Sequence, residues 1–384
     1  MNSSRFNKKK ILIISTSRSD FGLLKNTVLE IKKTKNLKFK LLVTGSHFIS
    51  KLGMTKNEIK TFLKQNVVFL KTLKINDKKK YKNNFEFKKL YKFLNNYKPD
   101  VALVLGDRFE ALMITSFLSS NNIPIAHISG GDLTFNTTDD NFRHAITKLS
   151  SVHFPESEHS RKILLQLGEE KKRIHKINSL SYETIKGLKF TKKNILEKKY
   201  DFKFDKKFVL FTFHPILGKE KNILVAKKVF RYLNDIIKKF SLKCVVTYPN
   251  SDIGFENILD EIKKLKKNKN FLIIKNLGII DYLSLLKISE LSMGNSSSCL
   301  IDAYYLNKKS LLIGNRQNGR KFHSKKILKA SYSEKDINQK FKKLIYLKEK
   351  YSQEKKIAKS PNRIANVLNK ISLPLGTLKK FQKK

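Results

Sequence analysis

The stretch KILIISTSRSD, residues 10–20, decides the fold class, because an apolar run of strand length ends in a group of polar residues. Such a run has no polar face, which is typical of a parallel strand covered on both sides. An amphipathic segment of helix length follows it, and the same succession recurs along the chain. The other runs are FKLLVTG (39–45), VALVLGD (101–107), IPIAHIS (123–129), FVLFTF (208–213), KCVVTYP (243–249), FLIIKN (271–276), LSMGN (291–295) and SLLIGN (310–315). We therefore predict an α/β protein with parallel sheets.

The chain has 384 residues, which is long for one core and suits two domains. We predict two Rossmann-like doubly wound domains, over 1–195 and 205–350, with the Lys-rich segment 187–206 as the linker. A helical segment within 352–384 is expected to join the first domain. Ligands bind at the carboxyl ends of parallel strands, so the strand ends of the two halves predict a cleft.

The formal net charge of +49 raises the possibility of nucleic-acid binding. About ten of the 81 basic residues are arginine, and the lysines are spread over nearly every segment. No zinc-finger, RNP-type or KH-type motif accompanies the charge. We therefore predict no nucleic-acid partner, and keep a basic nucleic-acid-binding protein as the alternative from a different class.

The apolar runs are too short to span a bilayer. The N-terminal stretch MNSSRFNKKKILIIST has a basic part and a short apolar part, but no small-residue cleavage site, and is better interpreted as a first strand. We predict a cytoplasmic protein without membrane insertion. Cys244 and Cys299 predict neither a disulfide framework nor a metal site.

The stretch GNSSS (294–298) ends a strand and precedes the helical stretch CLIDAYYL. Glycine and serines at a helix N-terminus offer N–H and hydroxyl donors to a diphosphate. A plain helix cap is the alternative. Asp302 is placed to accept from ribose hydroxyls, and Arg18 to reach the phosphates. The residues expected to contact substrate or nucleotide are Arg18, Asp20, Arg108, His127, Arg143, Asn250, Gly294, Asn295, Ser296, Ser297, Asp302 and Arg320.

Carboxylates and imidazoles also gather at the predicted strand ends, and such groups can divide acid and base roles. They are Asp107, Asp132, Asp139, Asp140, His127, His144 and His214. Each has a structural alternative: Asp107 and Asp139 could cap helices, and His144 could support the structure. No HxH or HExxH spacing is present, so no metal is predicted.

Three further stretches carry a family resemblance: GDRFEAL (106–112), PIAHISGGDLT (124–134) and DDNFRHAITKLSSVHF (139–154). With TSRSDFGLL (16–24), FTFHP (211–215), TYPNSD (247–252), GNSSS and RQNGR (316–320), they resemble the hydrolysing branch of the UDP-N-acetylglucosamine 2-epimerases. The similarity extends over nearly the whole chain.

The resemblance implies a GT-B-like pair of Rossmann domains acting on a UDP-sugar without cofactor. The implied reaction is elimination of UDP across C1–C2, then hydration of the glycal to a free sugar of the N-acetylmannosamine type, with C2 inverted. Such sugars serve sialic or legionaminic acid synthesis. By motif, Asp107 and Asp139 match catalytic carboxylates, and His214 the histidine that assists departure of the diphosphate. The resemblance further implies a homodimer or homotetramer.

Three positions depart from the family pattern: Ser129, Asn178 and Asp302. In well-known members a catalytic Glu occupies the position of Ser129, so either Asp132 substitutes as a catalytic residue or the chemistry is distributed differently. The enzyme alternatives are a non-hydrolysing UDP-sugar 2-epimerase and a GT-B glycosyltransferase. The motifs favour the hydrolysing branch.

Overall fold

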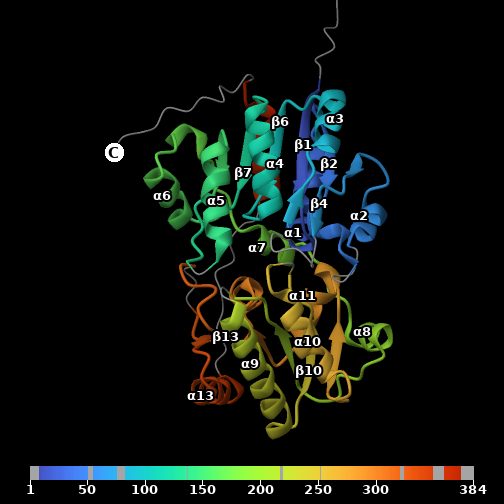
Figure 1. Cartoon of the computed structure of the whole chain (residues 1–384), viewed down its shortest axis with the longest axis vertical. Coiled ribbons are helices and arrows are strands. Elements are labelled where there is room, and N and C mark those ends of the chain that lie inside the picture. The colour runs from blue at the N-terminus through green and yellow to red at the C-terminus, as the bar shows by residue number, and fades with distance from the viewer. Residues whose placement is uncertain are drawn as a thin grey trace, which may run out of the picture. The chain divides into compact units, whose positions relative to one another are not determined.

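The computed structural model describes residues 8–50, 55–75, 83–135, 137–216, 219–250, 252–320, 324–348 and 359–372. The chain divides into two units (Figure 1). Unit 1 comprises Met1–Leu133, Thr138–Thr184 and Ile357–Lys384, and unit 2 comprises Thr134–Thr137 and Ile185–Lys356. Each unit is built on its own six-stranded sheet.

The sheet of unit 1 is parallel throughout, in the order β3-β2-β1-β6-β7-β8. Its strands are β1 (Lys9–Ser15), β2 (Leu37–Val43), β3 (Val67–Phe69), β6 (Val101–Leu105), β7 (Ile125–Ile128) and β8 (Val152–Phe154). The helices are α1 (Arg18–Lys33), α2 (Lys56–Phe62), α3 (Lys88–Tyr97), α4 (Phe109–Ser120), α5 (Thr138–Leu149), α6 (Glu158–Gln166), α7 (Leu180–Lys186) and α14 (Ser360–Lys370). The hairpin β4 (Leu73–Ile75) and β5 (Asn83–Phe85) and the 3-10 turns Gly45–Phe48 and Lys171–Arg173 complete the unit.

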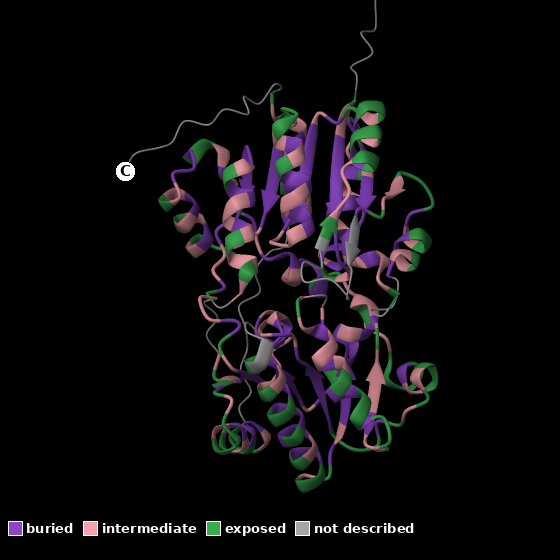
Figure 2. Ribbon diagram, viewed as in Figure 1, coloured by how far each residue is buried: buried purple, intermediate pink, exposed green. Residues whose placement is uncertain are grey.

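Strand β1 shows why this sequence forms a covered sheet. Ile11 and Ile13 pack in a core with residues of α1 and α14, whereas Leu12 and Ile14 pack in a second core with residues of α3 and α4. All four side chains are at most 2% exposed. Burying each such side chain stabilises the fold by about 1.5–3 kcal/mol. Figure 2 shows the strands of the sheet as buried, with α4 and α5 lying over one face.

Unit 2 repeats the plan with the strand order β11-β10-β9-β12-β13-β14, again parallel. Its strands are β9 (Phe208–Thr212), β10 (Lys243–Thr247), β11 (Phe271–Ile274), β12 (Leu291–Gly294), β13 (Ser310–Ile313) and β14 (Ile327–Ala330). The helices are α8 (Lys193–Tyr200), α9 (Lys219–Lys239), α10 (Phe255–Leu265), α11 (Gly278–Ile288), α12 (Ile301–Tyr305) and α13 (Glu334–Ile345), with a 3-10 turn at Ser297–Cys299.

Every apolar run quoted from the sequence contains one of these strands, and the predicted doubly wound α/β fold is confirmed. Strands β3, β8 and β14 were missed. They are three or four residues long and lie at sheet edges, where a strand needs fewer apolar residues.

The division of the chain differs from the predicted ranges. It falls between Thr184 and Ile185, so residues 185–195, predicted for the first domain, belong to unit 2. The predicted linker 187–206 contains α8, whose Leu196 is fully buried in the core of unit 2. Near the C-terminus, the described helix is α14, which packs against α1 in unit 1. The remainder of 352–384 lies outside the described residues.

In each sheet the strand order reverses at one place, between β1 and β6 in unit 1 and between β9 and β12 in unit 2. Ligands of doubly wound sheets bind beyond the carboxyl ends of the strands at this reversal. The candidate residues of each unit are therefore those that follow the carboxyl ends of its strands. Among the described helices, none has the length and apolarity needed to cross a membrane.

Candidate active site

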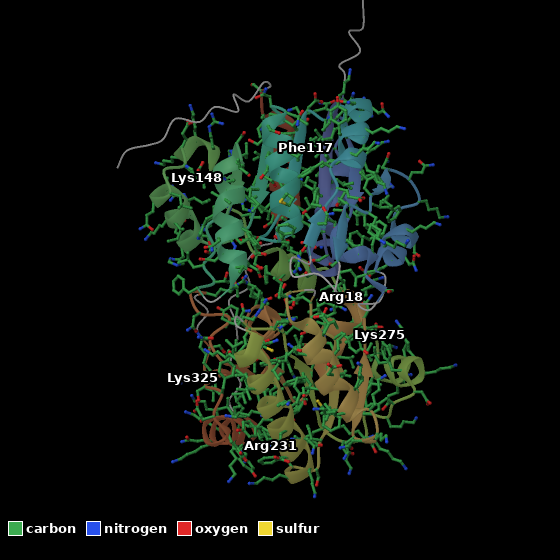
Figure 3. The ribbon with its side chains drawn as sticks, viewed as in Figure 1. Arg18, Phe117, Lys148, Arg231, Lys275 and Lys325 are labelled. Carbon is green, nitrogen blue, oxygen red and sulfur yellow. The ribbon has the colours of Figure 1, made fainter. Side chains whose placement is uncertain are left out.

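The loop after β1 carries the first two candidate residues, Arg18 and Asp20. The buried carboxylate of Asp20 accepts hydrogen bonds from the N–H of Thr16 at 3.0 Å and from its hydroxyl at 2.6 Å. It also accepts from the hydroxyl of Ser17 at 2.6 Å. Asp20 was expected to contact the substrate, but its oxygens shape the loop. Arg18, the first residue of α1, is partly exposed and remains the candidate for an anionic ligand (Figure 3).

Arg143 on α5 connects three acidic residues of unit 1 although its side chain is only 1% exposed. Its guanidinium ion-pairs with Asp107, donates to Asp140 at 2.8 Å and donates to the carbonyl of Asp132 at 2.9 Å. Burial lowers the pKa of Arg143, but the charges of Asp107, Asp132 and Asp140 outweigh it and raise the pKa above its usual value. Arg143 was expected to touch the substrate. In the structure it is the buried positive charge that holds the carboxylates, and the substrate contact stays a prediction.

The acidic members of this group are all partly exposed: Asp132, Asp107 after β6 and Asp140 on α5, the last two with side chains 22% and 17% exposed. Asp139 lies beside Asp140 in the first turn of α5 and is also partly exposed. Arg108 precedes α4, with its Nε 3.8 Å from a carboxylate oxygen of Glu110. These partly exposed groups are the ones that a substrate can reach.

His127 on β7 is fully buried and holds the loop that carries Asp107. Its Nε2–H donates to the carbonyl of Gly106 at 2.7 Å, and its Nδ1 lies 3.2 Å from the hydroxyl of Thr147. Burial lowers the pKa of His127 to about 3, so the ring is neutral at physiological pH. The buried ring of His127 fixes the position of Gly106, and its expected contact with the substrate stays a prediction.

Glu156, which lies two residues beyond β8, was not predicted as a site residue. Its Oε1 accepts a short hydrogen bond from the hydroxyl of Ser129, and its Oε2 accepts the N–H of Leu180 at 2.9 Å. Asp132 lies in the same region, where its carboxylate accepts from the hydroxyl of Ser160 at 2.6 Å. Ser129, directly after β7, is thus hydrogen-bonded through its hydroxyl to Glu156, a carboxylate that follows the neighbouring strand β8.

In unit 2, His214 follows β9 at the reversal of the sheet. Its Nδ1 accepts the N–H of Asn250 at 3.0 Å, so the proton of the neutral ring lies on Nε2. Asn295, which follows β12, binds both backbone groups of His214: Oδ1 accepts from N–H at 2.6 Å and Nδ2 donates to C=O at 2.8 Å. Asn295 is fully buried and supports His214 in this way, and its expected contact with a nucleotide stays a prediction.

The GNSSS stretch lies directly after β12. Gly294 has φ +139°, and a Cβ there would lie 1.9 Å from the carbonyl oxygen of Thr212, so a glycine is required. The side chain of Ser296 caps the 3-10 turn Ser297–Cys299 by accepting the N–H of Ser298. The α-helix that follows, α12, has five residues and is shorter than expected. Ser297 and Asp302 are partly exposed, and their contact with a nucleotide stays a prediction.

A polar network borders this stretch in unit 2. Asp252 accepts from Asn250 Nδ2 at 2.6 Å and from Arg316 at 2.9 Å. Gln317 donates to the carbonyl of Asn295 at 3.2 Å. Among the described residues, the buried Oδ1 of Asn250 and Nε of Arg320 have no hydrogen-bond partner. Both residues were predicted to bind the nucleotide, and both present polar atoms that a ligand can satisfy.

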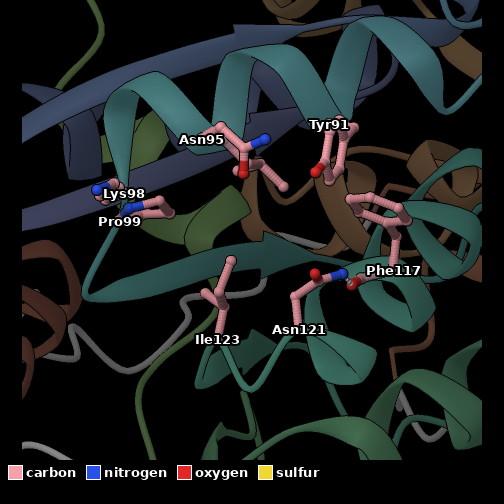
Figure 4. A pocket seen from close by; sticks show the side chains of 8 residues that line it. Tyr91, Asn95, Lys98, Pro99, Phe117, Asn121 and Ile123 are labelled. Carbon is pink, nitrogen blue, oxygen red and sulfur yellow. Dashed lines mark hydrogen bonds between the residues drawn. The ribbon is translucent and has the colours of Figure 1, made fainter.

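A pocket of about 240 Å³ lies elsewhere in unit 1 (Figure 4). Tyr91 and Asn95 of α3 face Phe117 of α4 across it. Pro99 and Ile123, also in its lining, precede β6 and β7. The pocket therefore lies at the amino ends of these strands, whereas the candidate residues follow the carboxyl ends.

In the described part of the chain, no three His, Cys, Asp or Glu side chains are grouped to hold a metal ion. Cys244 and Cys299 are buried free thiols. The basic side chains labelled in Figure 3, such as Lys148, Arg231, Lys275 and Lys325, come from different elements of both units.

Two doubly wound units with polar strand ends define an α/β protein of the GT-B-like type. The model of the UDP-N-acetylglucosamine 2-epimerase family matches residues 29–370. The chain therefore belongs to this family, and the predicted family is confirmed.

Known proteins resemble the chain over most of its length. The GDP/UDP-N,N'-diacetylbacillosamine 2-epimerase (hydrolyzing) of Campylobacter jejuni is 35% identical over 88% of each chain. The UDP-N,N'-diacetylbacillosamine 2-epimerase (hydrolyzing) of Legionella pneumophila is 29% identical over 81% of this chain and 82% of its own. The crystal structure of Methanocaldococcus jannaschii UDP-GlcNAc 2-epimerase with UDP-GlcNAc and UDP shares the fold, with TM-score 0.74, 19% identity and coverage of 94% and 99%. The family and the two relatives named hydrolyzing 2-epimerases confirm the predicted enzyme class, a hydrolysing 2-epimerase.

Proposed function

We propose that this enzyme acts on a UDP- or GDP-linked 2,4-diacetamido sugar, releasing the nucleoside diphosphate and the free sugar inverted at C2. The relatives named for N,N'-diacetylbacillosamine support this substrate class. The observation that carries the proposal is the division of ionisable groups: carboxylates around a buried Arg143 in unit 1, and a histidine with its proton on Nε2 in unit 2. The predicted cytoplasmic location and the homodimer or homotetramer stay predictions.

In the first half of the reaction, a carboxylate removes the proton from C2. Asp107 is our assignment for this base, because Arg143 orients it and part of its side chain is exposed. The electron pair of the C2–H bond becomes the C1=C2 double bond, and the C1–O bond breaks towards the diphosphate. His214 Nε2–H donates to the departing phosphate oxygen and so stabilises the charge that develops there. A glycal is left.

In the second half, water adds across the double bond of the glycal. The water oxygen bonds to C1, and C2 receives a proton on the face opposite to the one it lost. Asp132 and Asp139 are our remaining candidates for passing the proton that the water loses to bulk water. We assign the diphosphate and ribose to Ser297, Asp302, Asn250 and Arg320 of unit 2, and to Arg18 of unit 1, since their side chains are partly exposed.

The substrate class is tested by offering four compounds to the purified enzyme: UDP- and GDP-linked N-acetylglucosamine, and the UDP- and GDP-linked diacetamido trideoxy sugar. Initial rates of nucleoside diphosphate release are compared at equal concentration. We expect the diacetamido sugars to be turned over fastest. A clear preference for either N-acetylglucosamine compound would contradict the proposed substrate and leave the reaction type intact.

A further inference from the structure

The pair of Ser129 and Glu156 joins two strand ends of unit 1. Ser129 directly follows β7, and Glu156 follows the neighbouring strand β8 by two residues. The hydroxyl of Ser129 donates to Glu156 Oε1. Both side chains are partly exposed. The pair lies beyond the carboxyl ends of the strands, the side on which parallel sheets bind their ligands.

The surroundings of Glu156 differ from those of Asp107 and Asp140. Those two carboxylates share the guanidinium of Arg143, whereas the hydrogen bonds to Glu156 come from the hydroxyls of Ser129 and Ser179 and from the N–H of Leu180. Burial and the negative charge of Asp132 raise the pKa of Glu156, against the opposing effect of its hydrogen bonds. Glu156 therefore retains a proton to higher pH than an ordinary glutamate.

Another buried glutamate of unit 1, Glu169, shows what a purely structural carboxylate looks like here. Its side chain is 1% exposed, and it pairs with Lys148 Nζ at 2.8 Å and lies 2.9 Å from His153 Nε2. Glu156 instead is more exposed, and it is hydrogen-bonded to the hydroxyl of Ser129, which lies directly after β7. Two carboxylates in contrasting environments can serve as base and acid in one site.

We propose, resting on the proposed function, that Glu156 acts through the hydroxyl of Ser129 to deliver the proton that C2 receives during hydration. When Glu156 is protonated, its O–H donates to Ser129 Oγ and the Ser129 O–H is free to turn to C2; the Ser129 proton then passes to C2 as Glu156 gives its own proton to Ser129 Oγ. The π electrons of C1=C2 form the new C2–H bond, and a lone pair of water bonds to C1. The second proton of that water passes to bulk water, from which Glu156 is protonated again.

The test separates the two halves of the reaction in the Glu156→Gln variant. UDP release measures elimination, and proton NMR measures both the free sugar and the alkene proton of the glycal. We expect UDP release close to the wild-type rate, glycal accumulation, and free-sugar formation slowed about 100-fold. Ser129→Ala should accumulate glycal in the same way, and Ser129→Thr, which keeps the hydroxyl, should not.

The matched control is Glu158→Gln, two residues further on. Its side chain is 50% exposed and pairs with Arg161, so both rates should stay at wild-type values. Equal slowing of UDP release and sugar formation in Glu156→Gln, without glycal, would overturn the proposal and make Glu156 structural. Unchanged rates would overturn it too. If this variant does not fold, Ser129→Ala decides by the same two readouts. Failure of the wild-type enzyme to release a nucleoside diphosphate from either the UDP- or the GDP-linked sugar would instead reject the proposed function.

Discussion

The side-chain amide of Asn295 makes both backbone hydrogen bonds of His214: it accepts from N–H at 2.6 Å and donates to C=O at 2.8 Å. The two residues follow β9 and β12, the strands between which the order of the unit 2 sheet reverses. Asn295 therefore fixes the backbone that presents the histidine ring. This relationship makes Asn295 a positioning residue.

Asn295→Ala should lower both stability and turnover, because it leaves the N–H and C=O of His214 without their partner. Each buried unsatisfied group costs about 1–3 kcal/mol. Urea unfolding and the rate of UDP release measure the two effects. The exposed Asn366, which binds Asn362, provides the control: Asn366→Ala should change the unfolding free energy by less than about 0.5 kcal/mol. Wild-type turnover in Asn295→Ala would contradict the assigned role.

Asp107 and Asp100 lie at opposite ends of β6 and form a matched pair of carboxylates. Asp107→Asn should lower turnover by about 100-fold or more, since an amide cannot accept the C2 proton. UDP binding, measured by calorimetry, should persist. Asp100 accepts the N–H of Lys10 at 2.7 Å, a bond that asparagine can also make, so Asp100→Asn should stay active. Equal activity of the two variants would remove Asp107 from the mechanism.

His214→Asn should slow UDP release by about 100-fold, because the shorter side chain does not reach the position of Nε2. His214→Gln places an amide donor nearer that position and should retain more activity. A substrate with a better leaving group provides a second comparison. With it, both variants should lose less of the wild-type rate than they lose with the nucleoside diphosphate. If the variants lose the same factor with every leaving group, His214 does not act on the diphosphate.

Gly294 and Gly106 both have positive φ, but their surroundings differ. A Cβ at Gly294 would lie 1.9 Å from the carbonyl of Thr212, whereas a Cβ at Gly106 would meet nothing within 4 Å. Gly294→Ala should lower the unfolding free energy by roughly 3 kcal/mol. Gly106→Ala should lower it by only about 1–2 kcal/mol, the cost of placing alanine in the left-handed region. If denaturant titrations show equal losses of unfolding free energy in the two variants, the close approach to Thr212 does not contribute to the stability.

His127 should make the fold sensitive to acid. Its pKa lies near 3 in the folded chain, below the ordinary value of 6.5, so the unfolded chain takes up the proton first. The stability that it contributes is present above pH 6.5 and is lost as the pH falls towards 3. His127→Gln removes this titration, so the wild type should lose stability relative to the variant on acidification. A difference in unfolding free energy that stays constant over this pH range would contradict the assignment.

The central strands of both sheets, and the position of the candidate residues that follow them, could be predicted from the sequence. Hydrophobic runs without a polar face locate central strands, and residues directly after them reach the ligand side of the sheet. Asp107, His214 and Gly294 were found in this way. The short edge strands carry too few apolar residues for the same signal, which is why β8, and with it Glu156, was missed.

The direction of each side chain could not be predicted from the sequence. Arg143, His127 and Asn295 follow the pattern of binding residues, yet each is buried and supports a neighbour: Asp107, Gly106 and His214 respectively. Strand and helix register and packing decide whether a polar group faces a ligand or another residue. The pairing of Ser129 with Glu156 likewise depends on the register of β7 and β8.

The measurement that tests the central claim most directly is turnover of the UDP-linked diacetamido sugar in heavy water, followed by proton NMR. The account predicts equal amounts of UDP and free sugar, with C2 inverted and carrying deuterium. A product in which the epimerised sugar is still linked to UDP, or a free sugar that keeps its original hydrogen at C2, would contradict it.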